Sequence, residues 1–383
     1  MTRVVLLRRA DLLLQLAPLA ALCLVPGCRS ESSVVSGGLD AGGGSRFDTR
    51  ALTSEEQVEA EKLLERTAAF RKIEAHPRWE KWAARDLRLL SSEECESTIL
   101  ESWHSGPVRI PLRAATYVLR RDTHATLSFA YDEEDGSIRD YSNLYVRRAI
   151  EQELLAGENL DPELTREQAV ARAKEYVASV VGAFPGDLRL DMVQYIRPQT
   201  DPRDIDWTSF EPSGRSVTPK QAIALIRRHQ GPDLYDYAWS VRFYRYAGDM
   251  EYTSDELVIR FSERHGVERY FDKCYEPWDG KITVTADRAE AIAARADIQK
   301  HVWRSPEYPR EKYRLTVLKP RVRGERPVIM HVVKDDPRKV RAVWAVGVPY
   351  AWTPVDGSEE PQEYDRIGVL VDAETGELRG CVD

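Results

Sequence analysis

The sequence contains little of what metal-dependent or nucleophilic catalysis requires. Its seven histidines are scattered, no two of them lie three or four positions apart, and no His-Glu-x-x-His motif occurs. A zinc peptidase needs such a pair on one helical face, so that class of enzyme has no site here. Neither a Gly-x-Ser-x-Gly turn nor a phosphate-binding loop is present. We therefore expect no enzyme activity, no metal and no cofactor.

Positive charge is also scarce relative to negative charge. The chain has 55 Lys and Arg against 63 Asp and Glu, which gives a net charge of −8. Proteins that bind nucleic acid carry basic patches that neutralise phosphates. The acidic balance argues against that class of partner, and we expect no nucleic acid to bind.

A long membrane-spanning run is missing as well, although the N-terminus is apolar. Three arginines precede a largely apolar stretch over 12–26, which is short of the roughly 20 residues that cross a bilayer. A basic start and a short apolar run are parts of a secretory signal. The stretch ends in Val-Pro-Gly-Cys at Cys28, which resembles the lipobox of bacterial lipoproteins. An ordinary signal peptide or a short membrane anchor is the alternative.

The lipobox resemblance implies that Cys28 is acylated, for example with palmitate, and that these chains hold the protein to a membrane. Residues 1–27 are then a signal peptide that is removed. Residues 28–50 are rich in Gly and Ser and form a flexible linker. We expect the folded chain to lie in the cell envelope outside the cytoplasm, at the outer membrane or the periplasmic face.

Few cysteines remain for other purposes. An exported compartment permits one disulfide among Cys95, Cys274 and Cys381. Cys274 and Cys381 both lie shortly after a hairpin glycine, so we predict that these two are bridged and that Cys95 is the remaining thiol. The alternative is a nucleophilic Cys274, whose pKa Lys273 could lower.

Helix starts recur with one signature, a threonine followed by acidic or amide residues. Such starts predict helices over 53–70, 165–181, 218–229 and 285–300. In the first three, Glu or Gln stands three residues after the Thr, which is the spacing of a capping box. In the second helix, the apolar face includes Val181. These helices have one apolar face and are expected to lie on a sheet.

Two segments alternate as strands with one buried face do. They run over 237–243 and 343–348, and each has Trp-x-Val followed by a further apolar residue two places on. We predict that Trp239 and Trp344 hold equivalent core positions in two related units.

A hairpin signal occurs three times, as an acidic or polar loop that closes on glycine. The segments 132–139 and 372–379 match without a gap, and 262–269 is a weaker copy. Glycine supplies the left-handed backbone that such a turn needs. Helix, sheet and hairpin thus follow one another in each of 51–160, 161–280 and 281–383. We predict an α+β fold of tandem units, each a helix packed on an antiparallel sheet.

The last unit, with its Ala-rich helix and its Trp-x-Val strand, closes on Gly-Val-Leu-Val-Asp-Ala-Glu-Thr-Gly-Glu-Leu over 368–378. It resembles the PepSY family, in which a helix lies on an antiparallel sheet and the final strands carry a Val-Asp-Ala-x-Thr-Gly-Glu-like signature. The unit at 161–280 resembles the related tandem repeats of bacterial envelope proteins, but Ser262 replaces the expected Asp. The resemblance implies a module that inhibits or modulates peptidases, and it supplies no catalytic residues.

We therefore expect a non-catalytic envelope lipoprotein that binds a protein or peptide, since an open sheet edge accepts an added strand. Trp79 and Trp82, three apart on an expected helix, are candidates for an exposed binding surface, and burial in a core is the alternative. Two other functions stay open: an envelope hydrolase whose site is assembled from dispersed residues, and a structural or assembly lipoprotein.

Overall fold

The computed structural model describes residues 49–71, 83–99, 108–120, 122–197, 237–302, 308–309, 311–331, 338–357 and 364–382. Several predictions lie outside these residues: the signal peptide with Cys28, nearly all of the linker, the helix at 218–229, and Trp79 with Trp82.

The first third of the described chain is a helix followed by four antiparallel strands and a second helix. The capping box is formed: Thr53 accepts from the backbone N–H of Glu56, and the Glu56 side chain accepts from the N–H of Thr53. The elements are α1 (Ser54–Arg66), two short 3₁₀ turns (Ala68–Phe70 and Ala84–Asp86), β1 (Leu87–Ile99), β2 (Val108–Leu119), β3 (Asp122–Tyr131), β4 (Ile138–Asn143) and α2 (Leu144–Ala156).

The second third repeats the order of one helix and then four strands. Thr165 and Gln168 form the capping box of its helix, as predicted. Val181, expected on the buried face, is 44% exposed because it is the last helical residue before Gly182. The elements are α3 (Arg166–Val181), β5 (Leu188–Ile196), β6 (Ala238–Ala247), β7 (Met250–Ser262) and β8 (Gly266–Asp272).

The last third has one long strand with shorter strands on both sides. Its helix ends at Ala293, earlier than the predicted 300, because i to i+3 bonds tighten the chain there and turn Ile298 into the core. The elements are α5 (Ala286–Ala293), β9 (Tyr313–Val317), β10 (Arg321–Val322), β11 (Val328–His331), β12 (Val340–Pro354), β13 (Asp365–Asp372) and β14 (Leu378–Val382).

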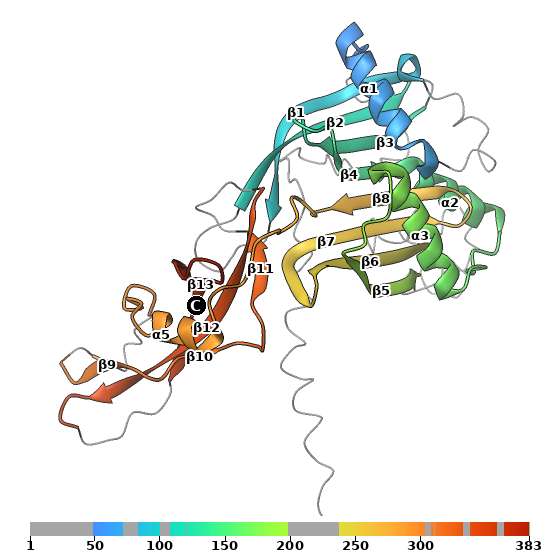
Figure 1. The fold of residues 1–383 in the computed structure, drawn as a ribbon. Coiled ribbons are helices and arrows are strands. Elements are labelled where there is room, and N and C mark those ends of the chain that lie inside the picture. The colour runs from blue at the N-terminus through green and yellow to red at the C-terminus, as the bar shows by residue number, and fades with distance from the viewer. Residues whose placement is uncertain are drawn as a thin grey trace, which may run out of the picture. The chain divides into compact units, whose positions relative to one another are not determined.

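The strands join into one mixed sheet, and the fold as a whole consists mostly of strands with few helices (Figure 1). β4 pairs with β8, which links the first two groups of strands. β7 meets β11 in a parallel bridge between Tyr252 and Ile329, and all other strand pairs are antiparallel. The order of the main path is β1-β2-β3-β4-β8-β7-β11-β12-β13-β14, with β6 and β5 continuing from β7 and with β9 and β10 on β12.

The three predicted hairpins are present between β3 and β4, β7 and β8, and β13 and β14. In each, the first loop residue holds the turn: Asp132 and Asp372 accept backbone N–H bonds of about 3 Å through Oδ1, and Ser262 accepts two of 3.3 Å through Oγ. Ser262 therefore supplies the oxygen that aspartate supplies in the other two hairpins, but it does not supply the negative charge. The turn glycines are Gly136, Gly266 and Gly376, at φ 66°, 87° and 78°.

Two large apolar cores lie on this sheet. Trp239 belongs to the first core, is 4% exposed, and donates from Nε1 to Glu263 at 2.6 Å. Trp344 belongs to the second, is 6% exposed, and donates to the carbonyl of Val284 at 2.8 Å. Both indoles are thus buried with their N–H satisfied, as predicted for core positions.

Candidate functional site

Cys274 is the one predicted site residue whose side chain the structure describes. Its side chain is partly buried and packs against the first core. Burial, together with the carboxylates of Asp272 and Asp255, raises the pKa of this thiol well above its ordinary value. Lys273, expected to lower that pKa, instead lies 3.9 Å from Glu256. The prediction that Lys273 lowers the pKa of Cys274 is therefore wrong. The side chain of Cys381 is outside the described residues, so the bridge stays a prediction.

A buried polar cluster surrounds the junction of β7 and β11. Nε2 of His331 lies 3.2 Å from Oδ1 of Asp255, and both side chains are 1% exposed. Arg245 reaches the other oxygen of Asp255 at 3.3 Å and the carbonyl of Tyr275 at 2.7 Å. These contacts pair every charge of the cluster and fasten β11 to β7. They hold the sheet together without forming an accessible reaction centre.

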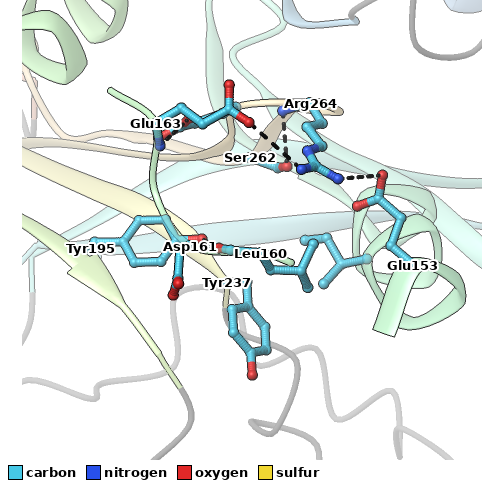
Figure 2. A pocket seen from close by; sticks show the side chains of 10 residues that line it. Glu153, Leu160, Asp161, Glu163, Tyr195, Tyr237, Ser262 and Arg264 are labelled. Carbon is cyan, nitrogen blue, oxygen red and sulfur yellow. Dashed lines mark hydrogen bonds and ion pairs between the residues drawn. The ribbon is translucent and has the colours of Figure 1, made fainter. Parts of the chain in front are cut away.

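A shallow pocket, of about 290 Å³ with part of that volume open to solvent, lies beside the β7–β8 hairpin (Figure 2). Figure 2 shows the Arg264 guanidinium between Glu153 and Glu163, at 3.6 Å from each. Burial raises the pKa of Glu153, but the hydrogen bond from His265 and the charge of Arg264 lower it overall. The carboxylates of Glu153 and Glu163 are engaged in ion pairs with Arg264. This side of the pocket is therefore suited to holding the hairpin against α2 rather than to acid–base catalysis.

β9 pairs with the end of β12 that is remote from β11 (Figure 1). An aromatic cluster lies at this end. The ring of Tyr308 lies 5.2 Å from those of Tyr313 and Tyr364 and stacks on Trp352 at 6.1 Å. Tyr350 lies 6.0 Å from Tyr364 and 6.2 Å from Trp352. Segments far apart in the sequence therefore supply one continuous aromatic surface.

One ring of this cluster and two nearby valines are exposed. Tyr364 is 42% exposed, Val317 is 46% exposed and Val355 is 57% exposed. These three belong to the eight exposed large hydrophobic residues of the described chain, and they lie around the section of β12 that pairs with β9. Exposed apolar side chains that gather in one place mark interaction sites more often than scattered ones do. We call these three residues and the five rings (Tyr308, Tyr313, Tyr350, Trp352 and Tyr364) the β9 corner.

The strand at this corner also has an open side. β9 pairs with β12 alone within the described part of the chain. Leu318 donates its N–H to Pro349, and Lys312 accepts from Val355, so the even-numbered residues between them face β12. Because backbone groups alternate along an antiparallel strand, the N–H and C=O groups of Leu315 and Val317 point away from β12. An incoming strand would find donors and acceptors there.

Two of the described strands with one paired side carry more charge than β9 does, whereas β14, which pairs only with β13, also has a single charged residue, Arg379. β5 pairs only with β6 among the described strands, and it carries Arg189 and Asp191. β1 carries four charged residues along its length. Charges on an edge discourage the addition of a further strand. β9 has one charged residue, Arg314, and its other side chains are apolar, aromatic or neutral.

The β9 corner was missed by sequence reasoning. A partial signal existed in the alternation Tyr-x-Leu-x-Val over 313–317, which predicts a short strand with one apolar face. The remaining members come from three separate segments, and only the fold brings them together.

The described residues contain no group of three or more His, Cys, Asp or Glu side chains placed to hold a metal ion. Among the helices of the described ranges, none is long and apolar enough to cross a membrane.

Comparisons with known proteins add little to this geometry. No family model matches the chain, and no curated protein is similar to it in sequence. Among solved structures, the C-terminal domain of YpeB from Bacillus megaterium is similar with a TM-score of 0.30 and 8% identity, over 87% of this chain and 97% of that chain. The functional argument therefore depends on the described residues.

Proposed function

We propose that this chain is a non-catalytic binding protein whose β9 corner takes up an extended segment of another protein as an added strand. One observation supports this most: the N–H and C=O groups of Leu315 and Val317 point away from β12, at an edge where the Val317 side chain is 46% exposed. Strand addition combines main-chain hydrogen bonds, which give affinity, with side-chain pockets, which give specificity.

The side chains at the corner are of the kind that dominates protein interfaces. Tyrosine and tryptophan form most interface hot spots, because each buries a large surface at little entropic cost. Trp352 and Tyr350 are already buried, at 9% and 2% exposure, and provide a rigid base. Val317 lies opposite Tyr350 and would lose exposure beside a strand added at β9, which stabilises the complex by about 25 cal/mol per Å² of apolar surface buried.

The cellular setting is part of the same proposal. In this proposal the lipobox-like sequence attaches the protein to an envelope membrane through Cys28, and the PepSY-like interpretation of the units makes a peptidase one candidate for the bound protein. A tethered binder needs no catalytic group of its own, which is consistent with the absence of sequence motifs for catalysis.

A pair of substitutions at one position tests strand addition. Val317→Pro removes an outward N–H while leaving the bonds from neighbouring residues to β12 in place, since proline is tolerated on an edge strand. Val317→Ala removes the side chain and keeps the N–H. Each full-length variant is used to select extended segments from a displayed peptide library. The wild-type chain and Val317→Ala should enrich common sequences, and Val317→Pro should lose at least tenfold of that enrichment.

Val58→Ala on α1, a position that is 52% exposed, serves as the control for loss of an exposed valine. Equal selection by Val317→Pro and the wild-type chain would reject strand addition at β9. A wild-type chain that enriches nothing would reject peptide binding and favour the structural role.

A further inference from the structure

A row of basic residues follows the β9 edge in an otherwise acidic chain. From Lys312 to Gly324 the sequence has five Lys or Arg and no Asp or Glu, although the net charge of the chain is −8. Arg314, Arg321 and Arg323 are all exposed in the structure. Sequence reasoning missed this run, because it is short and because the net charge of the chain is negative.

The register places these residues on one side of the sheet. Arg314 lies opposite Thr353, and Arg321 lies opposite Gly347, so both belong to the sheet face that does not meet α5. Since β9 and β10 line the same edge of β12, the two arginines follow each other along that edge, roughly 20 Å apart at 3.3 Å per residue of β12.

Two further arginine side chains lie over Gly347 on this face. A Cβ at that position would lie 3.5 Å from Nε of Arg323 and 3.7 Å from Cδ of Arg366, which are ordinary contact distances. The face is basic from β9 across β12 to Arg366 on β13.

The other side of the edge is apolar. Tyr313 and Leu315 pack against the second core. Val317 lies on the same face as these two residues, because side chains alternate along the strand and Arg314 and Thr316 lie on the opposite face. An added strand would thus meet apolar side chains on one face and arginines on the other. Since strand side chains alternate with a period of two, the two faces select different residues at alternate positions.

From this alternation we propose that the segment bound at β9 is acidic, with Asp or Glu at every second position and apolar residues between them. This inference rests on the proposed function, and it names the kind of partner. The carboxylates of the segment face Arg314 and its basic neighbours, and the apolar side chains face Leu315 and Val317. Each opposite-charge cross-strand pair is expected to strengthen binding about two- to fivefold.

Three capped, fluorescently labelled peptides of alternating sequence provide the probes: Val-Glu, Val-Gln and Val-Lys repeats of about ten residues. Their dissociation constants for the full chain are measured by fluorescence anisotropy at low and high salt. The Val-Glu peptide should bind more tightly than Val-Gln by about tenfold, Val-Lys should bind least, and added salt should narrow these differences.

Substitution of Arg314 tests whether its charge causes the preference for the Val-Glu peptide. Arg314→Gln should abolish most of the preference for Val-Glu, and Arg314→Glu should reverse it towards Val-Lys. Arg288→Glu, at an exposed position on α5 in the same unit, alters the net charge equally and should leave the preference intact.

The outcomes distinguish the two claims. If Val-Gln and Val-Glu bind equally and both are weakened by Val317→Pro, strand addition stands and the acidic partner is rejected. If the preference for Val-Glu survives in Arg314→Glu, the basic row is not its cause. If none of the peptides binds, the proposed function itself fails.

Discussion

Val317 on β9 lies directly opposite Tyr350 on β12, yet Val317 is 46% exposed and Tyr350 only 2% exposed. One strand spacing, about 4.8 Å, therefore separates the interior of the second core from solvent. An additional strand beside β9 would move this boundary outward without rearranging the core.

The second core depends on Trp344, whose indole is 6% exposed and donates to the carbonyl of Val284. Trp344→Ala should lower the free energy of unfolding by about 3–5 kcal/mol, because it leaves a large cavity. Trp344→Phe should cost less, since most of the volume is kept. Urea unfolding monitored by far-UV circular dichroism measures both, and a loss below about 1 kcal/mol for the alanine variant would contradict the assigned core position.

Asp140 on β4 should make stability fall as the solution becomes less acidic. Burial raises the pKa of its carboxyl to about 6, although Arg269 at 3.8 Å opposes the shift. The folded state then binds a proton more strongly than the unfolded state, so the stabilisation is present below pH 4 and is lost as the pH rises through 6. Asp140→Asn should therefore stabilise the protein at pH 7–8, by on the order of 1–3 kcal/mol, and change little near pH 4.

The comparison for Asp140 is made across pH rather than at one value. Glu276→Gln, at an exposed residue after β8, provides the matched carboxyl-to-amide control. A difference between the wild-type chain and Asp140→Asn that stays constant from pH 4 to pH 8 would show that Asp140 ionises normally.

Membrane attachment through Cys28 is tested in cells. Cys28→Ser should leave the precursor uncut and release the protein from the membrane fraction, because acyl chains supply about 0.8 kcal/mol per buried methylene. The measurement is fractionation with metabolic labelling by a palmitate analogue. Normal processing and continued sedimentation of the variant with membranes would remove the lipoprotein interpretation.

The predicted bridge between Cys274 and Cys381 is decided by peptide mapping without reduction. The bridge predicts a linked peptide pair, and it needs Cα atoms within about 7 Å. Alkylation of Cys95, Cys274 and Cys381 without prior reduction would rule it out. A linked peptide that contains Cys95 would show that another pair forms.

Capping residues and turn glycines in the sequence correctly predicted the starts of helices and the positions of hairpins. Thr53 and Thr165 began helices as predicted, and the turn glycines of the three hairpins adopt the left-handed backbone. The order of helix and then strands also follows the prediction, while the duplication of the units stays a hypothesis.

What the sequence did not predict depends on contacts between distant segments. The pairing of β4 with β8 and of β7 with β11 joins strands that no local pattern relates. The same holds for the β9 corner, where Tyr308 meets Tyr364 across 56 positions of sequence. Trp79 and Trp82 were chosen as a binding surface from a short local motif, and they lie outside the described residues.

Amide hydrogen exchange at β9 tests the central claim most directly. Exchange is measured residue by residue in the full chain, alone and with a saturating amount of the tightest peptide selected by the wild-type protein. Strand addition predicts that the amides of Leu315 and Val317 become slow on binding, while that of Thr316, which faces β12, is slow in both states. Unchanged exchange at Leu315 and Val317 when the peptide is bound, or protection confined to β5 or β14, would contradict binding at β9.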